Sequence, residues 1–302
     1  MKQNKVITKA VIAAAGFGTR FLPQTKAMPK EMLPLIDKPV IQYVVEELVS
    51  VGVKDIIIVT GYSKRAIEDH FDKPNEDLRG NLLMGGSKKA HYIKMIDQIS
   101  EMANFIYVRQ KGPYGSATPL LNTEHLLGNE PFYYTWSDDF IVSSPLRFKQ
   151  MLDSYNKYQA PILSCIEVSK EQEYDRYGIC GGQKIDPSTI RIDQIIEKPG
   201  IKKAPSNLAT VSGYVLTKDV FKYCRTVLKN LKNDQEFYAV DALNLMAKSN
   251  NKVIGNIIQN AKYYDLGNIM DYHKTVIDFA LQNKELGPEL KDYIRKQIKT
   301  LE

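Results

Sequence analysis

Cysteine is scarce in this sequence, and its N-terminal region lacks a long hydrophobic run. Only three cysteines occur, Cys165, Cys180 and Cys224. Their odd number and wide spacing exclude a disulfide framework and a Cys-x-x-Cys metal or redox site. The apolar run at residues 10–15 is far below the roughly 20 residues that span lipid, and it is too short for a signal peptide. We therefore expect a cytoplasmic protein that has no membrane partner.

Charge of one sign is not concentrated anywhere along the chain. The 41 Lys and Arg residues and the 35 Asp and Glu residues give a net charge of +6, and the two signs are interspersed. A nucleic-acid-binding protein would usually carry a basic stripe or an aromatic RNA-binding motif. Because the sequence has neither, we expect no nucleic-acid partner. The excess positive charge is either ordinary surface charge or attracts a small polyanion.

Apolar residues in the N-terminal half predict alternating strands and helices. Residues 8–15 and 55–60 are apolar without alternation, as in parallel strands that are buried on both faces. Between them, Val40, Val44 and Leu48 recur at helical spacing and predict an amphipathic helix. The other elements predicted here are helices capped by Ser63 and ending near 71, and from about 119 to 127, and strands at 105–109 and 132–136. This order is typical of right-handed βαβ crossovers in an open, doubly wound sheet.

The C-terminal half predicts strands that follow one another without intervening helices. After a helix at 145–158 and a strand at 162–168, short strands are predicted near 179, at 192–196 and at 211–217. Such strands indicate a mixed, partly antiparallel addition to a mostly parallel core. The remaining predicted elements are helices at about 218–230 and 236–249, a strand at 253–258, and helices at about 268–283 and 287–300. We predict one α/β domain over 1–302, with 268–302 as a C-terminal helical extension.

Residues 16–34 contain the clearest chemical signal. This segment follows a predicted strand and precedes a predicted helix, the position at which open α/β sheets bind ligands. Gly16 and Gly18 allow the backbone to approach a phosphate closely. A triphosphate would fit this cationic loop, with Arg20 giving bidentate contacts and Lys30 a point charge. The same residues could also form a solvated basic loop on the surface.

Carboxylates near the ends of predicted strands are candidate ligands. Asp138 and Asp139 follow the strand that ends at Trp136, so one of them can reach the sheet edge as an oxygen ligand for Mg²⁺. An Asp-Asp pair in this position is also common as a turn or a helix cap. Glu197 and Lys198 end another strand and could be an ordinary surface pair. We assign Trp136, the only tryptophan, to core packing beside the site.

Several motifs together resemble those of a known family. Gly16-x-Gly18-Thr19-Arg20-x-x-Pro23, with Lys30 downstream, resembles the signature of nucleotidyltransferases that act on sugar 1-phosphates. The continuation LPLIDKPVIQYVVEE is closely similar to the bacterial UTP–glucose-1-phosphate uridylyltransferases. Further matching segments are YGI at 177–179, EKP at 197–199, APSNLA at 204–209, YVL at 214–216 and DLGN at 265–268. Roughly residues 74–104 show no match.

This resemblance implies a Rossmann-like nucleotide-diphospho-sugar transferase fold, a requirement for Mg²⁺, and a reaction of UTP with glucose 1-phosphate that gives UDP-glucose and pyrophosphate. It implies that Arg20 and Lys30 are the catalytic cations on the triphosphate, and that Asp138 and Asp265 are metal ligands. The implied nucleotide-binding residues are Ala14, Ala15, Gly16, Gly18, Thr19, Gln110 and Gly115, with Gln110 on the uracil. The implied sugar-phosphate-binding residues are Gly178, Glu197 and Lys198.

Departures from the family pattern leave alternatives open. After Gln110 the sequence reads GPYGSATPLL instead of the usual Gly-x-Gly-His-Ala pattern, and Trp136-Ser137 precede Asp138 where Leu-Gly or similar is usual. Both changes lie near the implied nucleotide pocket, so a thymidylyltransferase or another sugar-1-phosphate nucleotidyltransferase is the alternative within the class. A non-catalytic protein that binds nucleotide sugars is the alternative from a different class.

The two terminal helices carry more apolar residues than the sheet should need. Ile277 and Ile298 are examples. They predict a homo-oligomeric interface, although packing against the same chain would also cover them.

Overall fold

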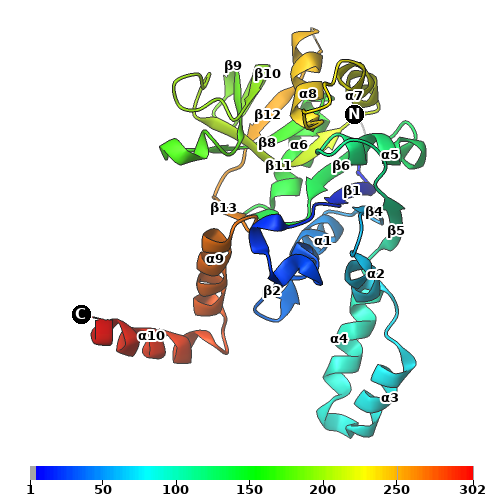
Figure 1. Cartoon of the computed structure of the whole chain (residues 1–302), viewed down its shortest axis with the longest axis vertical. Coiled ribbons are helices and arrows are strands. Elements are labelled where there is room, and N and C mark those ends of the chain that lie inside the picture. Colours follow the sequence, from blue (N-terminus) through cyan, green and yellow to red (C-terminus); the bar gives the residue numbers. More distant parts are fainter. Residues whose placement is uncertain (1–4, 250, 302) are drawn as a thin grey trace.

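A computed structural model describes residues 5–249 and 251–301 of the chain. Its centre is a nine-stranded sheet in the order β5-β4-β1-β6-β11-β8-β12-β10-β9 (Figure 1). The strands of this sheet are β1 (Lys9–Ala14), β4 (Asp55–Thr60), β5 (Asn104–Arg109), β6 (Phe132–Trp136), β8 (Ile162–Glu167), β9 (Gly178–Asp186), β10 (Thr189–Glu197), β11 (Leu208–Leu216) and β12 (Ile254–Ile257). Helices cover both of its faces.

Two hydrophobic cores lie on opposite faces of the sheet. Ala10 and Ile12 of β1 belong to one core and Val11 to the other, because successive side chains of a strand point to opposite faces. The first core includes α1 (Val40–Ser50) and α6 (Arg147–Tyr158); the second includes α5 (Thr118–Leu127), α7 (Asp219–Lys229) and α8 (Ala239–Lys248). Burial on both faces explains why β1 shows no polar alternation in the sequence.

The sheet is mixed, as predicted, but it is open and parallel in only one half. The strands β5, β4, β1 and β6 pair in parallel, as predicted. In the other half, β11 pairs antiparallel with β6, β8 and β9, and β10 pairs antiparallel with β9 and β12. Because β9 pairs with both β10 and β11, the strands β11, β8, β12, β10 and β9 close into a ring. The prediction of an open sheet was wrong for this half, since periodicity does not reveal which distant strands pair.

A separate two-stranded sheet was not predicted. Strand β7 (Asp139–Ser143) pairs antiparallel with β13 (Ala261–Asp265), in a register that places Asp139 opposite Asp265. The N–H of Leu266 also donates a hydrogen bond to the carbonyl oxygen of Asp138, at 3.0 Å. This ribbon therefore brings Asp138 and Asp265, which are far apart in the sequence, to the same edge of the molecule.

Two helical segments project from the sheet (Figure 1). They are the hairpin of α3 (Glu76–Met84) and α4 (Ala90–Ser100), and the pair α9 (Ile269–Gln282) and α10 (Gly287–Leu301). None of the residues of α3 and α4 is buried, and these helices occupy the region in which no family motif was recognised in the sequence. The terminal helices α9 and α10 were predicted, whereas their status as an extension of one domain stays a prediction. No helix in the described part of the chain is both long and apolar enough to cross a membrane.

The start of α2 (Arg65–Phe71) differs from the prediction. Ser63 does not cap this helix; Lys64 precedes it, without a side-chain cap. Ser63 instead has a φ of 59°, in the left-handed region. The turn is followed at once by Lys64, whose side chain is buried beneath the site described next.

Candidate active site

Two adjoining cavities lie at the carboxyl ends of β1 and β6. One has a volume of about 400 Å³ and the other of about 500 Å³. Both cavities are lined by Lys30, Ser116, Trp136, Asp138 and Glu236. These shared residues mark the boundary at which a ligand in one cavity meets a ligand in the other. Such an arrangement suits two substrates that react with each other.

The conformation of the loop after β1 is fixed by contacts within the loop itself. It contains three short 3-10 turns, at Thr19–Phe21, Gln24–Lys26 and Lys30–Met32. Gly18 has a φ of 68°, and a Cβ there would lie 3.1 Å from the Cβ of Lys30, so both the turn and the close packing require glycine. The hydroxyl of Thr25 donates a hydrogen bond to the carbonyl oxygen of Gly18 at 2.7 Å. The loop thus presents Arg20, whose Nη1 donates to the carbonyl oxygen of Gly267 at 3.2 Å, to the smaller cavity.

Four charges of alternating sign lie beside and beneath the cavities. Lys30 Nζ lies 2.5 Å from Asp138 Oδ2, and Lys64 Nζ lies 2.6 Å from Glu31 Oε2. Burial opposes the charge of Lys30, but Asp138, followed by Glu31 and Asp139, raises the pKa of Lys30 above its usual value. Lys30 therefore carries its positive charge at neutral pH, although its side chain is only 20% exposed.

Asp138 and Asp265 converge on a small space beside Gly267. A Cβ on Gly267 would lie 2.9 Å from Asp265 Oδ1, 3.4 Å from Asp138 Oδ2 and 3.5 Å from Arg20 Nη1. Nowhere in residues 5–249 and 251–301 do three or more His, Cys, Asp or Glu side chains gather into a complete metal site. Two oxygens beside an anion-binding loop nevertheless suit Mg²⁺, which one or two protein carboxylates commonly hold together with substrate phosphates. The donor set fits this ion.

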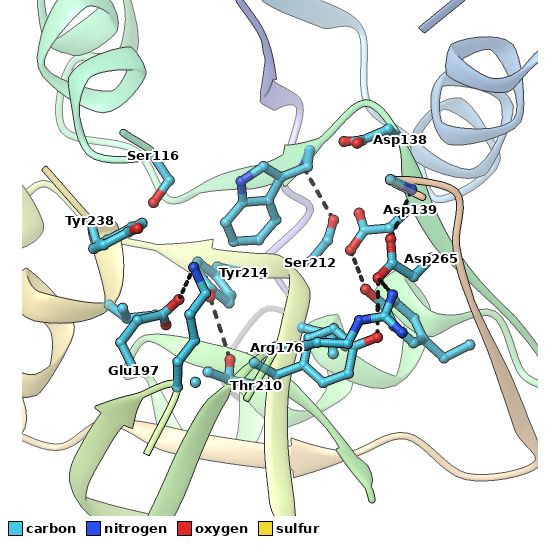
Figure 2. Close-up of a pocket in the computed structure, with 18 of the residues that line it drawn as sticks. Ser116, Asp138, Asp139, Arg176, Glu197, Thr210, Ser212, Tyr214, Tyr238 and Asp265 are labelled. Atoms are coloured by element: carbon cyan, nitrogen blue, oxygen red, sulfur yellow. Dashed lines mark hydrogen bonds and ion pairs between the residues drawn. The ribbon is translucent and has the colours of Figure 1, made fainter. Parts of the chain in front are cut away.

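Asp265 is oriented by groups that sequence reasoning did not identify. Arg176 donates through Nη2 to Asp265 Oδ2 at 2.5 Å and through Nη1 to Asp271 Oδ2 at 3.0 Å. The hydroxyl of Tyr177 donates to the same Asp265 oxygen at 3.1 Å, and the N–H of Gly267 donates to Oδ1 at 2.8 Å. Figure 2 shows Arg176 beside Asp265 at one end of the cavity. The sequence signal that could have indicated Arg176 is its position directly before the YGI segment at 177–179, which belongs to the family resemblance.

Asp139 lies behind Asp138 and is nearly inaccessible to solvent. The hydroxyl of Tyr263 donates a hydrogen bond to Asp139 Oδ2 at 2.8 Å. Burial, and secondly the charge of Asp138, raise the pKa of Asp139 to about 6. Asp138 is the more exposed of the two carboxylates, so it is the better candidate for contact with an ion.

The opposite side of the smaller cavity holds Glu197 and Lys198. Glu197 ends β10 and pairs with Gly178 of β9, and a Cβ on Gly178 would lie 3.1 Å from Glu197 Oε2. Glycine here leaves room for the carboxylate. Burial raises the pKa of Glu197, while Lys198, whose Nζ is 3.6 Å away, opposes that shift. Figure 2 shows Glu197 and Tyr238 across the cavity from Asp138.

The structure brings most of the implied residues to these two cavities. The smaller is lined by Arg20, Lys30, Asp138, Gly178, Glu197, Lys198 and Asp265. The larger is lined by Ala15, Gly16, Lys30, Gln110, Gly115 and Asp138. Three implied residues line neither of the two: Ala14 is buried in the core, Gly18 shapes the loop, and Thr19 begins its first turn.

Several lining residues had not been assigned to the site. Trp136, which was expected to pack in the core beside the site, does pack against one core, but it is half-buried and lines both cavities, with its ring centroid 5.2 Å from that of Tyr214. Other unassigned residues that line the smaller cavity are Ser116, Arg176, Tyr177, Thr210, Val211, Ser212, Tyr214, Glu236, Tyr238, Val240, Tyr263 and Gly267. Those that line only the larger cavity are Ala13, Phe17, Tyr114 and Pro119. The residues on β11 reach the cavity because this strand pairs antiparallel with β6, a pairing that the sequence pattern did not show.

Comparison with known proteins agrees with this geometry. Residues 9–281 match the family model described as nucleotidyl transferase. The chain belongs to this nucleotidyl transferase family. It is 40% identical over 292 residues to a UTP–glucose-1-phosphate uridylyltransferase of Staphylococcus epidermidis, which covers 97% of this chain and 99% of the relative. It is 38% identical over 296 residues to one of Bacillus subtilis, with coverage of 98% and 97%.

Solved structures are similar to this nucleotidyl transferase over nearly the whole chain. A UDP-glucose pyrophosphorylase in complex with UDP-glucose superposes with a TM-score of 0.80, at 38% identity, and covers 92% of this chain and 100% of its own. A UTP-bound UGPase from Acinetobacter baumannii gives a TM-score of 0.85 at 33% identity, with coverage of 95% and 98%. The mixed α/β nucleotidyltransferase fold and the resemblance to bacterial UTP–glucose-1-phosphate uridylyltransferases are therefore confirmed.

Proposed function

We propose that this nucleotidyl transferase is a UTP–glucose-1-phosphate uridylyltransferase, with UTP in the larger cavity and glucose 1-phosphate in the smaller one. The observation that carries this proposal is the pair of adjoining cavities that share Lys30 and Asp138. The cationic loop borders one side of that boundary, and Glu197 and Lys198 lie on the other. Relatives of this name at 38–40% identity, and similar structures that hold UTP and UDP-glucose, support the choice of substrates.

The reaction needs little covalent chemistry from the protein. A phosphate oxygen of glucose 1-phosphate attacks the α-phosphorus of UTP, the bond to the β-phosphate oxygen breaks, and pyrophosphate leaves in line. The nucleophile is already an anion, so no general base is required. Lys30 lies where the two substrates meet, and its charge offsets the negative charge of the phosphates that must approach each other.

Other residues orient the substrates. Gly16 and Gln110 line the larger cavity, where the backbone at Gly16 can contact the triphosphate and the amide of Gln110 can pair with the edge of the base. Arg20 lines the smaller cavity beside Asp138 and Asp265, from which its guanidinium can contact phosphate oxygens at the boundary between the two substrates. Glu197 is placed to accept hydrogen bonds from sugar hydroxyls, and Lys198 to contact the sugar phosphate. Holding both reactants in one geometry supplies much of the rate enhancement of such a transfer.

We also propose that the enzyme uses Mg²⁺, held by Asp138 and Asp265. The ion, when bound, would neutralise phosphate charge and orient the triphosphate. Arg176 and Tyr177 keep Asp265 Oδ1 directed at the space beside Gly267. Lys30, which is paired with Asp138 Oδ2, can transfer its contact to a phosphate oxygen when the nucleotide arrives.

A pyrophosphate-release assay tests the function. UTP, dTTP, CTP and ATP are each offered with glucose 1-phosphate and Mg²⁺, and we expect the highest kcat/KM for UTP. A dTTP value well above that for UTP would make the enzyme a thymidylyltransferase, the alternative left open by the changes near Gly115 and Trp136. Tight binding of UDP-glucose without turnover at any Mg²⁺ concentration would instead support a non-catalytic nucleotide-sugar-binding protein.

We further propose a cytoplasmic homo-oligomer. The three cysteines are buried free thiols, which suits a reducing compartment. Ile277 of α9 and Ile298 of α10 are about half exposed, at 50% and 51%, so the chain's own sheet leaves them accessible to a second copy.

A further inference from the structure

Two exposed aromatic rings meet at the mouth of the larger cavity. Phe17 and Tyr114 both line this cavity, and their ring centroids are 5.5 Å apart with the planes tilted by 59°. Phe17 is 54% exposed and Tyr114 is 64% exposed. Single apolar residues on a surface need no explanation, but two large rings in contact at the rim of a cavity suggest a ligand.

The two rings belong to loops that face each other across the cavity. Phe17 lies in the loop after β1, between the two glycines, and Tyr114 lies in the loop after β5. The second loop is anchored: the N–H of Phe237 donates to the carbonyl oxygen of Tyr114, and the N–H of Ala117 donates to that of Phe237, each at 2.8 Å. A Cβ on Gly115 would lie 2.2 Å from the carbonyl oxygen of Phe237, so only glycine allows this close approach.

Anchoring of the backbone beside an exposed ring has an energetic consequence. The backbone at Tyr114 is held in one position before any ligand arrives, so binding restricts mainly the rotation of the side chain. An aromatic side chain with only two rotatable bonds adds to this advantage. The rim of the cavity is therefore preorganised to receive a flat, apolar surface.

We propose that Phe17 and Tyr114 stack on the face of the nucleotide base and supply affinity without selecting among pyrimidines. This inference rests on the proposed function, because it takes the larger cavity as the nucleotide site. Stacking on aromatic rings tolerates any base, since every base has a π face. Selection is left to Gln110, whose amide can read the edge of the base in the same cavity.

The experiment compares ligands that have a base with one that lacks it. Binding of UTP, dTTP and inorganic tripolyphosphate, each with Mg²⁺, is measured by calorimetry for the wild type, Phe17→Ala and Tyr114→Ala. Loss of one stacking contact weakens binding about 5- to 150-fold. We expect a loss in this range for at least Tyr114→Ala, the same factor for UTP and dTTP, and no change for tripolyphosphate.

Matched variants separate stacking from other effects. Tyr114→Phe keeps the ring and removes the hydroxyl, so it should restore the affinity for UTP. Tyr92→Ala removes a ring that is 47% exposed on α4, away from both cavities, and should not change binding of any of the three ligands.

Three results would overturn the stacking proposal: unchanged UTP affinity in both alanine variants, an equal loss for tripolyphosphate, or a loss for UTP that dTTP does not share. Failure of the proposed function has a different signature. A wild type that forms no UDP-glucose from UTP and glucose 1-phosphate contradicts the function, whereas a wild type that forms it while both alanine variants bind UTP normally contradicts only the stacking.

Discussion

Lys30 and Asp138 are shared by both cavities, so their removal should affect the chemical step. We expect Lys30→Ala and Asp138→Ala each to lower kcat by about 100- to 1000-fold, because each removes charge that is preorganised around the phosphates. Steady-state kinetics with saturating UTP and glucose 1-phosphate measure this effect. Circular dichroism should show that both variants retain the fold. Near-normal kcat in both variants would contradict the mechanism.

Gly267 offers a test of the metal site that does not depend on activity. Gly267→Ala should fold, because its φ lies outside the left-handed region, but the new methyl group would occupy the space between Asp138 and Asp265. Loss of correct ligand placement typically costs about 10- to 100-fold in metal affinity. We expect a loss of this size for Mn²⁺, used as a probe and followed by paramagnetic resonance. Gly80→Ala is the control, since a Cβ there meets no atom within 4 Å. Unchanged Mn²⁺ affinity in Gly267→Ala would exclude this position for the ion.

Asp139 should make stability depend on pH. Its pKa rises from 3.8 to about 6 on folding, so the folded state keeps its proton to a higher pH than the unfolded state. The contribution of Asp139 is therefore most favourable below about pH 4 and is lost as the pH rises towards 6. Asp139→Asn removes this pH-dependent contribution. Between pH 4 and pH 7, the free energy of unfolding of the wild type should therefore fall relative to that of Asp139→Asn by an amount on the order of 2 kcal/mol. Urea unfolding at both pH values measures this, and parallel curves for the two proteins would contradict it.

At the scale of elements, the hairpin of α3 and α4 should be much less stable than the helices that pack on the sheet. These helices bury no residue, whereas α1 buries six, among them Val40, Val44 and Leu48. Helices gain most of their stability from packing of an apolar face, so exposed ones open by local unfolding. We expect backbone amides of α3 and α4 to exchange with deuterium at least about 100-fold faster than those of α1, as measured by mass spectrometry. Equal protection would show that another surface covers the hairpin.

The N-terminal half of the fold was largely predictable from the sequence. Residues 55–60 coincide with β4, and 132–136 with β6, because apolar runs bounded by turns leave few alternatives. The loop from Gly16 to Lys30 was also identified as a ligand site, since its glycines and cations lie close together in the sequence. Both the strand positions and the position of the loop are therefore predictable from residues that are close together in the sequence.

The ring and the ribbon could not be predicted in the same way. β9 pairs with β11 through residues such as Gly178 and Thr210, and β7 pairs with β13 through Asp139 and Asp265. Pairings of this kind depend on how distant strands meet, and no local periodicity encodes that meeting. For the same reason Arg176 was missed, because its partner Asp265 lies on a strand that had not been predicted.

At the scale of the whole molecule, we expect the terminal helices to form the interface of the proposed homo-oligomer. Tyr293 and Ile298 of α10 are 58% and 51% exposed, and contact with a second copy would remove this surface from water. Light scattering should give a molar mass that is a multiple of the 34.4 kDa chain. We expect Ile298→Glu, which would place a charge in the proposed interface, to lower the mass, while the exposed Leu83→Glu on α3 should not. A monomeric wild type would contradict the prediction.

The junction between β6 and β11 has a consequence for how such an enzyme can change. The open half of the sheet carries the proposed nucleotide side, the ring carries the proposed sugar side, and the two are joined by antiparallel pairing such as Tyr134 with Tyr214. The relative position of the two proposed substrate sites therefore depends on this main-chain pairing more than on the side chains around it. Substitutions of residues that line only one of the two cavities should therefore change which base or which sugar is accepted, while the relative position of the cavities set by the β6–β11 pairing stays the same.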